Sequence, residues 1–334
     1  MARRSADREQ LAAVVRAGLG ADRRIEELTR LRGGTKKGVY RLTLDDRCTV
    51  VAYVWSPGEN YWPDRPAVPA DAPSGDVLAD ASDSELFEAA NAALGAAGVR
   101  TPEILLLDRS RSRCPADVAL VQDVPGPNLE QRLAAEPAAT ADTMARLAEA
   151  LTAMHARQDT RIGRLATLAR SAGSSPAGGA SPVETVRNRA LADLAEAAGR
   201  DDRIARDRVR LAELLHGLAD ETRPRTTYRL VHGELGPDHV LVNADGEPVL
   251  IDIEGLMFFD VEWEHVFLRL RFGAHYDALA TEGLDERRMR FYQLAQHLSL
   301  VAGPLRLLDG DFPDRTFMLD IAAYHTDRAL SFTA

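Results

Sequence analysis

The amino-acid sequence predicts an α+β fold with a β-rich first part and a mainly helical second part. Short apolar runs rich in β-branched residues, separated by turn residues, dominate the chain up to residue 124. Beyond that point apolar residues recur with helical spacing. One hairpin signal, at 239–253, interrupts the helical part. The 334 residues can bury one large core or two moderate ones.

The first part is predicted to contain two helices and several strands. Residues 6–19 carry apolar residues at helical spacing. The capping-box pattern Ser82-x-x-Glu85 predicts a second helix, which ends at Gly98. Strands are expected on both sides of a glycine-rich turn at 32–38, and then at 48–55, 104–108 and 118–123.

Two segments have the composition of loops. Residues 56–82 are rich in Pro, Gly, Asp and Ser, which predicts a long surface loop or lid. Tyr61 and Trp62 within it either stack on a ligand or pack onto the surface, and packing is favoured. Residues 170–181 are of low complexity, which is typical of a mobile segment.

The second part is predicted to be built from long helices. A helix at 140–158 ends near His155, which is expected to be a packed histidine rather than a ligand. Ser181-Pro182-Val183-Glu184 combines an N-cap, a proline at the first helical position and a capping-box glutamate. Further helices are expected at 182–198, 202–220, 285–308 with a break near Gly303-Pro304, and 312–331.

Composition narrows the range of partners. A net charge of −10 without a long basic run argues against nucleic acid and is compatible with a cationic small molecule. The two cysteines, Cys48 and Cys114, lie far apart without metal-type spacing, as expected of reduced thiols in the cytoplasm. The sequence has neither an apolar signal segment at its start nor a run of membrane-spanning length. It does not indicate an oligomeric state.

The hairpin at 239–253 gathers residues that bind metals. Two apolar runs flank Asn243-Ala244-Asp245-Gly246, a polar turn signal. If Asn243 faces Pro248, the register places His239 opposite Asp252, and directly opposed residues have Cβ atoms about 4.5–5.5 Å apart. Glu234 lies on the loop that leads into the hairpin. The register therefore predicts a site at the open end of the hairpin.

The same residues carry a resemblance. His232-Gly233-Glu234-Leu235-x-x-x-His239 followed by Ile251-Asp252-x-Glu254 resembles the catalytic segment of the aminoglycoside phosphotransferase family, small-molecule kinases with a two-lobed, protein-kinase-like fold. The family pattern is His-Gly-Asp-Leu-x-x-x-Asn, then Ile-Asp-x-Glu. The resemblance implies that Glu234 is the catalytic base, that Asp252 is the main metal ligand and that His239 stands at the position of the metal-binding Asn.

The resemblance also assigns the nucleotide side. It implies that ATP or GTP binds with its phosphates under the glycine-rich turn and its base at a hinge between the lobes. The domain boundary would fall at that hinge, which gives a nucleotide-binding lobe at 1–124 and a catalytic, substrate-binding lobe at 125–334. The implied nucleotide-binding residues are Gly33, Gly34, Thr35, Lys36 and Lys37 in the turn and Gln122, Asp123 and Val124 in the hinge.

Three departures from the family pattern leave the activity open. The candidate strand 49–55 has no lysine, so Lys36, Lys37 or Arg41 would have to supply the phosphate-side charge. Without that lysine, the two candidates for the helix glutamate, Glu85 and Glu88, are expected to be solvated. Glu and His replace the usual Asp and Asn. The alternatives are therefore an active kinase for a hydroxyl of an antibiotic or another metabolite, and a pseudokinase that binds a nucleotide or small molecule as a sensor or scaffold.

The sequence also leaves open which metal binds and what role two further acids have. Asp252 suits Mg²⁺, whereas the imidazole of His239 favours Mn²⁺ if it is a ligand at all; otherwise it hydrogen-bonds Asp252. Asp260 and Glu264 lie four residues apart after the hairpin. They either brace the catalytic loop, as the resemblance implies, or are surface acids at the start of a helix.

Overall fold

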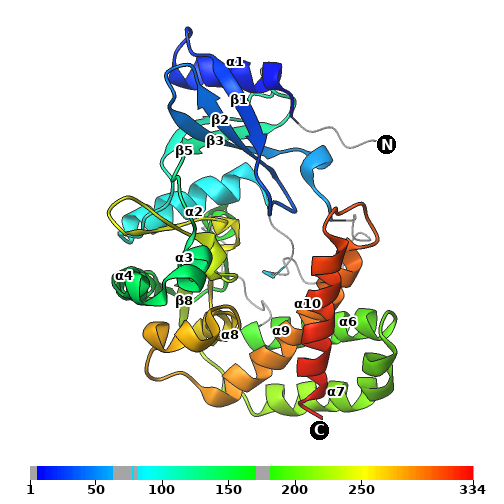
Figure 1. Cartoon of the computed structure of the whole chain (residues 1–334). Helices are drawn as coiled ribbons and strands as arrows, with labels where there is room; N and C mark the ends of the chain where they lie inside the picture. The colour runs from blue at the N-terminus through cyan, green and yellow to red at the C-terminus, as the bar shows by residue number, and fades with distance from the viewer. Residues whose placement is uncertain (1–5, 63–76, 79–81, 171–180, 334) are drawn as a thin grey trace. The chain divides into compact units, whose positions relative to one another are not determined.

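The computed structural model describes residues 6–62, 77–78, 82–170 and 181–333 (Figure 1). The segments predicted as a lid (56–82) and as a low-complexity loop (170–181) lie largely outside these residues. The chain divides into two compact units, of which the first contains Met1–Trp62, Ala81–Arg146 and Asp238–Glu254. The second contains Pro63–Asp80, Leu147–Pro237 and Gly255–Ala334. This division by contacts does not test the predicted boundary at 124.

The first unit is built on a five-stranded antiparallel sheet in the order β1-β2-β3-β5-β4. Alternate residues of β2, Tyr40, Leu42 and Leu44, are buried on one face, as the period of a strand requires. The strands are β1 (Ile25–Arg30), β2 (Gly38–Leu44), β3 (Thr49–Trp55), β4 (Ile104–Asp108) and β5 (Asp117–Gln122).

Two helices pack with this sheet. Helix α1 (Arg8–Leu19) starts at the capping box of Asp7 and buries Leu11 and Val14 in the same core as β2. Helix α2 (Ser84–Ala96) is capped by Asp83, whose carboxylate accepts from Leu86 N at 2.7 Å. The predicted cap at Ser82 is therefore wrong by one residue, because Asp83 lies where the helix leaves free N–H groups.

The hairpin in the first unit differs from its predicted register. Strands β9 (Val240–Val242) and β10 (Pro248–Leu250) pair Pro248 with Val242, not with Asn243. The side chain of Asn243 accepts hydrogen bonds from the backbone N–H of Asp245 and Glu247, which keeps it in the turn. His239 consequently faces Ile251, whose N–H donates to the His239 carbonyl at 3.0 Å.

The second unit packs helices around one apolar core with a short four-stranded sheet in the order β6-β8-β11-β7. The helices of this unit are α5 (Leu165–Arg170), α6 (Pro182–Ala198), α7 (Asp202–Asp220), α8 (Val261–Phe272), α9 (Glu286–Leu307) and α10 (Arg315–Leu330). Its strands are β6 (Gln158–Asp159), β7 (Gly163–Arg164), β8 (Tyr228–Val231) and β11 (Met257–Phe259). Helix α3 (Leu129–Ala135) belongs to the first unit, and α4 (Ala141–His155) continues from the first unit into the second. Short 3₁₀ turns are η1 (Pro57–Glu59), η2 (Pro137–Thr140), η3 (Pro237–His239), η4 (Ile253–Gly255) and η5 (Gly273–Leu279).

One predicted helix break does not occur. Helix α9 continues through Gly303 and Pro304, both of which are buried. Because Pro304 lies in the last turn, it removes one intrahelical hydrogen bond without stopping the helix, and packing of α9 against its neighbours outweighs that loss. Helix α6 begins at the predicted cap, where Ser181 and Glu184 form the capping box.

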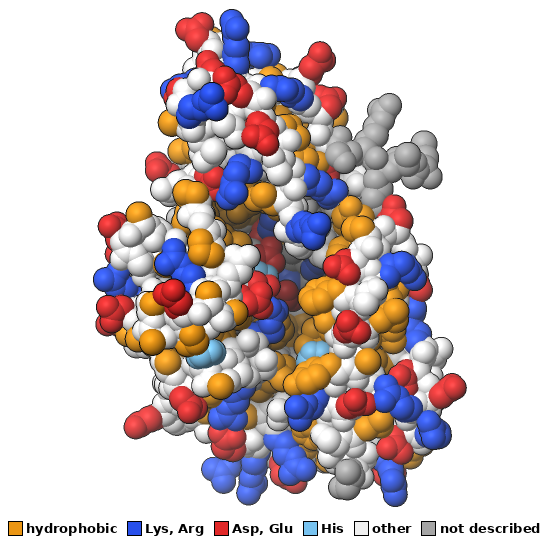
Figure 2. All heavy atoms as spheres, viewed as in Figure 1, with side chains coloured by type: hydrophobic (Ala, Val, Ile, Leu, Met, Phe, Trp, Pro, Cys, Tyr) orange, Lys and Arg blue, Asp and Glu red, His pale blue; other side chains and the backbone are white. Residues whose placement is uncertain are grey.

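The surface is mixed in charge. Figure 2 shows basic and acidic side chains interspersed over the face in view, with hydrophobic side chains over α10. Phe317, Leu319 and Tyr324 of α10 are about half exposed. No helix among the described residues is long and apolar enough to cross a membrane.

Candidate active site

A buried lysine and two carboxylates form a cluster in the first unit. The Lys37 ammonium lies 2.8 Å from Oδ1 of Asp252 and also donates to Oε1 of Glu254. Lys37 is 6% exposed and Glu254 4%, whereas the Asp252 side chain is 46% exposed. The cluster therefore fixes the lysine on its buried side and leaves one carboxylate open to a ligand.

The cluster keeps the lysine charged. Burial lowers the pKa of Lys37, but the charges of Asp252 and Glu254 outweigh burial and raise the pKa above its usual value. The ammonium also lies 5.1 Å from the centroid of the Tyr53 ring, a cation–π distance. These effects together favour the charged form of Lys37 beside the exposed Asp252 carboxylate.

Tight turns position Lys37 at the start of β2. A Cβ on Gly34 would lie 2.5 Å from the carbonyl oxygen of Lys37, and Gly33 has a φ of +105°. Tyr61 N–H donates to the Thr35 carbonyl at 2.8 Å. The close approach and the positive φ both require glycine, so the local sequence specifies this turn.

Lys36 of the turn contacts one of the aromatic residues that follow β3 and η1. The Lys36 ammonium is 5.7 Å from the centroid of the Trp62 ring, and Trp62 Nε1 donates to Thr35 Oγ1 at 3.1 Å. Tyr61 accepts from Arg30 at its hydroxyl. Tyr61 and Trp62 therefore pack onto the first unit, as the favoured alternative predicted. The two neighbouring lysines thus have different surroundings, and Lys37 is the one that bonds to Asp252 and Glu254.

Strand β3 carries no lysine, and one of its faces presents an aromatic ring. Val50 and Ala52 of β3 pack into the core with α1, which directs Tyr53 to the opposite face. There Phe87 of α2 makes an edge contact with Tyr53, with ring centroids 5.4 Å apart. Glu85 and Glu88 of α2 are exposed, in agreement with the prediction of solvated glutamates. Glu88 pairs with Arg109 at 2.9 Å.

Asp252 and His239 are close despite the register error. Nε2 of His239 lies 3.8 Å from Oδ2 of Asp252 and 3.7 Å from Oδ2 of Asp238. Asp252 has a φ of +59°, a left-handed conformation that Asp adopts more readily than most residues. Its carboxylate is thereby directed to both Lys37 and His239.

Of the two candidate metal donors, the Asp252 carboxylate suits a hard cation better than the His239 imidazole does. Among the described residues, no group of three or more His, Cys, Asp or Glu side chains could hold a metal. Mg²⁺ does not require one, since it is commonly bound by one or two carboxylates, waters and substrate phosphates. Asp252 fits that role, and His239 is near enough to serve as its hydrogen-bonding or ligand partner after a small movement.

The predicted hinge residues lie at the end of β5. Gln122 N–H donates to the Glu103 carbonyl at 2.9 Å, and Asp123 forms an ion pair with Arg41 at 2.8 Å. Gln122 and Val124 line a cavity of about 630 Å³ whose walls also include parts of α2 and of the β9–β10 hairpin. Lys37 and Asp252 do not line it. The cavity is therefore distinct from the lysine–carboxylate cluster.

Glu234 lies in the second unit, on a segment that a buried acid holds. Glu264 of α8 is completely buried and accepts hydrogen bonds from the N–H groups of His232 and Gly233, the latter at 3.1 Å. Burial raises the pKa of Glu264 to about 7, although both hydrogen bonds act in the opposite direction. Glu234 itself is exposed. The bracing alternative for Glu264 is the one that the structure shows.

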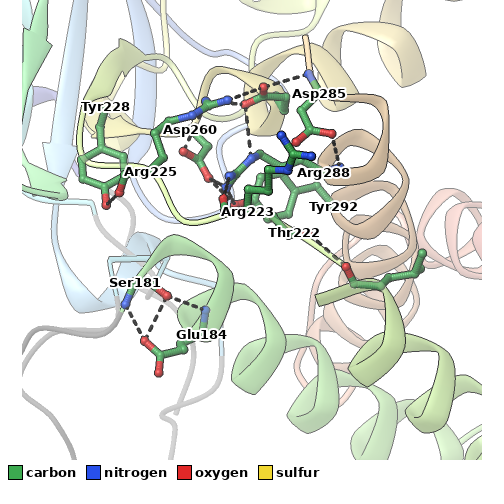
Figure 3. A network of polar contacts seen from close by, with 12 residues as sticks. Ser181, Glu184, Thr222, Arg223, Arg225, Tyr228, Asp260, Asp285, Arg288 and Tyr292 are labelled. Atoms are coloured by element: carbon green, nitrogen blue, oxygen red, sulfur yellow. Dashed lines mark hydrogen bonds and ion pairs between the residues drawn. The ribbon is translucent and has the colours of Figure 1, made fainter. Parts of the chain in front are cut away.

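A second buried network surrounds Asp260. Asp260 accepts from Arg288 and, at 2.6 Å, from the Tyr292 hydroxyl (Figure 3). Arg225 joins it by pairing with Glu262 through two contacts of 2.8 Å. Burial raises the pKa of Asp260 even though Arg288 acts in the opposite direction. Asp260 and Glu264 are therefore not surface acids, because both are completely buried and accept hydrogen bonds from groups inside the second unit.

These features define the class of protein. An antiparallel sheet with a glycine-rich turn, a buried lysine beside an Ile-Asp-x-Glu segment and a mainly helical second part are the parts of a kinase-like phosphotransferase. The chain belongs to the phosphotransferase enzyme family, whose family model matches residues 27–302. No curated protein matches the sequence.

Solved structures agree with this fold. The spectinomycin phosphotransferase complex with ADP and spectinomycin has a TM-score of 0.63 at 13% identity, over 97% of this chain and 95% of that one. The GDP complex of aminoglycoside 2'-phosphotransferase-IIIa has a TM-score of 0.61 at 19% identity, over 97% and 99%. The AMP complex of LicA has a TM-score of 0.60 at 13% identity, over 98% and 100%. At these identities the likeness shows the fold alone.

Proposed function

We propose that this chain transfers a phosphoryl group from ATP or GTP to a hydroxyl of a small molecule. The observation that carries the proposal is the contact of 2.8 Å between Lys37 and Asp252. It supplies, from the glycine-rich turn, the cation that β3 lacks, and it does so next to the carboxylate suited to the metal. Phosphoryl transfer depends mainly on positioning and on neutralising phosphate charge, which this pair supports.

Each residue has a role in this proposal. A bound Mg²⁺ or Mn²⁺ would neutralise phosphate charge, and Asp252, with His239 beside it, would hold that metal. Lys37 donates to a phosphate oxygen, and the turn from Gly33 to Thr35 covers the phosphates. The backbone of 122–124 binds the nucleotide base. Glu234 positions the acceptor hydroxyl and accepts its proton late in the reaction.

The acceptor is proposed to be an antibiotic or another metabolite, and a cationic one fits the net charge of −10. Related structures were solved with spectinomycin and with hygromycin B, which supports this class of acceptor. The competing proposal is a pseudokinase that binds a nucleotide or small molecule as a sensor or scaffold. Glu234 and His239, at positions where the family pattern has Asp and Asn, favour this second function.

Nucleotide-dependent turnover separates the two functions. The assay measures loss of ATP or GTP, with Mg²⁺ or Mn²⁺, across a panel of hydroxylated metabolites and aminoglycosides. A kinase consumes nucleotide only with its acceptor, and Asp252→Ala abolishes both turnover and metal-dependent nucleotide binding. Nucleotide binding without turnover on any acceptor would favour the pseudokinase.

The two lysines of the turn provide a matched pair of variants. Lys37→Ala should weaken nucleotide binding by about 1–3 kcal/mol, the scale of a lost charge-assisted hydrogen bond. Lys36→Ala should change it by much less, because Lys36 lies against Trp62 on the surface of the turn. Calorimetric titration measures both. Equal affinities for Lys37→Ala and the parent would remove Lys37 from the phosphate site.

A further inference from the structure

We infer that Glu254 is the positioning residue for Lys37, in place of a glutamate on helix α2. This inference rests on the proposed function, because it assigns Glu254 a part in binding the nucleotide phosphates. Related kinases are expected to orient the phosphate-side lysine with a helix glutamate. In this chain the lysine is Lys37, in the turn before β2, and its proposed partner is Glu254.

The contacts of Lys37 point to Glu254. A lysine ammonium has three N–H donors. Asp252 and Glu254 accept two of them, which leaves one for a phosphate oxygen. Of the two acceptors, Glu254 is the buried one, at 4% exposure against 46% for the Asp252 side chain. Asp252 can therefore exchange the lysine for a metal, whereas Glu254 keeps it in place.

Helix α2 offers no competing partner at this point. It presents Phe87 to β3, and its two candidate glutamates, Glu85 and Glu88, are exposed. Between β3 and α2, Tyr53 and Phe87 form an aromatic pair. The Lys37 ammonium lies over the Tyr53 ring, 5.1 Å from its centroid. The contact between β3 and α2 is thus aromatic, and the ion pair of the lysine is Lys37–Glu254.

Asp252 and Glu254 lie on one short segment, which links the position of the metal to the position of the lysine. Glu254 is two residues after Asp252, so one short segment holds the metal carboxylate and the lysine carboxylate. Any displacement of this segment moves both groups together. The segment therefore keeps the distance between the phosphate-side cation and the metal position constant, which in-line transfer requires.

The test compares phosphorylated and unphosphorylated ligands. Glu254→Gln should weaken the binding of ATP or GTP, with Mg²⁺ present, about tenfold, the scale of a charged hydrogen bond. It should leave the binding of adenosine or guanosine unchanged, since these ligands have no phosphate for Lys37. Glu254→Asp, which keeps the charge, should recover part of the loss. Glu88→Gln is the matched control and should leave all four affinities at the parent values.

A double-mutant cycle guards against loss of folding. Removing one partner of a buried pair is more disruptive than removing both. In the background Lys37→Met, Glu254→Gln should therefore cause no further loss of triphosphate affinity. An equal loss for nucleoside and triphosphate, or an additive loss in the double variant, would overturn the inference. If the parent binds neither ATP nor GTP, the proposed function fails as well; if it binds and Glu254→Gln is neutral, only the inference fails.

Discussion

Each unit of the chain contains a buried cation paired with carboxylates, and the two clusters differ in how they meet solvent. In the first unit, Lys37 is 6% exposed but its partner Asp252 has a side chain that is 46% exposed. In the second unit, Arg288 is 2% exposed and Asp260 is completely buried. Lys37 and Arg288 are both buried and paired with acids. The two clusters therefore differ in the exposure of their carboxylates, Asp252 and Asp260.

The exposure of the carboxylate distinguishes a candidate ligand-binding cluster from a structural one. Asp260 accepts from Arg288, Tyr292 and Arg225, and these partners join α8, α9 and the segment before β8. A carboxylate enclosed in this way is out of reach of a cation from solvent and links the elements around it. Asp252 instead presents an open carboxylate that a cation can reach. Exposure of the acid, more than the presence of an ion pair, therefore distinguishes the candidate site from the scaffold.

The strongest test of this comparison is a pair of equivalent substitutions. Asp260→Ala should lower the free energy of unfolding by about 3–5 kcal/mol, because it leaves the buried Arg288 without its main partner. Asp252→Ala should cost far less stability, yet it should abolish metal-dependent nucleotide binding. Denaturant unfolding measures the first effect and calorimetry the second. Similar losses of stability in both variants would mean that Asp252 is a structural residue.

A smaller effect, on turnover, is expected from substitution of Glu234, the exposed acid on the segment that Glu264 holds. Glu234→Gln should reduce turnover about 10²-fold, the usual contribution of a positioned base. Nucleotide affinity should change by less than about tenfold, because Lys37 and Asp252 bind the phosphates and metal in this proposal. Steady-state kinetics on the identified acceptor, together with nucleotide titration, separates these quantities.

Glu234→Asp sharpens the same prediction. If the 232–237 segment has adjusted to the longer side chain, shortening it moves the carboxylate and lowers the rate. If Glu234 is a tolerated substitution, Asp matches or exceeds the parent. Turnover by Glu234→Gln at the parent rate would show that Glu234 is not the base.

The sequence predicted most of the fold because local signals were strong. The strand at 104–108 and the helices at 182–198 and 202–220 agree with β4, α6 and α7. Capping and periodicity act within a few residues, so one sequence suffices to find them. The hairpin register was wrong by one residue because the side chain of Asn243 takes part in the turn, a choice that strand propensity alone does not determine.

The candidate site was predictable only where its motif is local. Nε2 of His239 lies 3.8 Å from Oδ2 of Asp252, so the two residues are close as predicted, although they are not directly opposed. The pairing of Lys37 with Glu254 joins residues 217 positions apart, and nothing in the sequence near either residue indicates it. The burial of Asp260 and Glu264 was likewise decided by distant partners. The one usable signal was the absence of a lysine on β3, which required a cation from elsewhere.

The smallest predicted effect concerns a third buried cluster, which contains no carboxylate. Nδ1 of His297 on α9 lies 2.8 Å from Nδ1 of His325 on α10, so one neutral ring donates to the other. Burial lowers the pKa of His297 to about 3 and that of His325 to about 4, with nearby arginines acting in the same direction. Both histidines therefore stay neutral in the folded chain under conditions where an unfolded histidine takes up a proton.

The direction of the pH effect follows from this difference. Stability is fully present above about pH 6.5, the ordinary histidine pKa, and falls below it because the unfolded chain binds protons that the folded chain excludes. Each histidine should contribute a loss of about 1 kcal/mol between pH 6.5 and 5.5. His297→Asn should reduce this slope, whereas His216→Asn, at an exposed position on α7, should not. Unfolding midpoints measured across this range decide the matter, and an unchanged slope in His297→Asn would show that the α9–α10 contact does not control acid sensitivity.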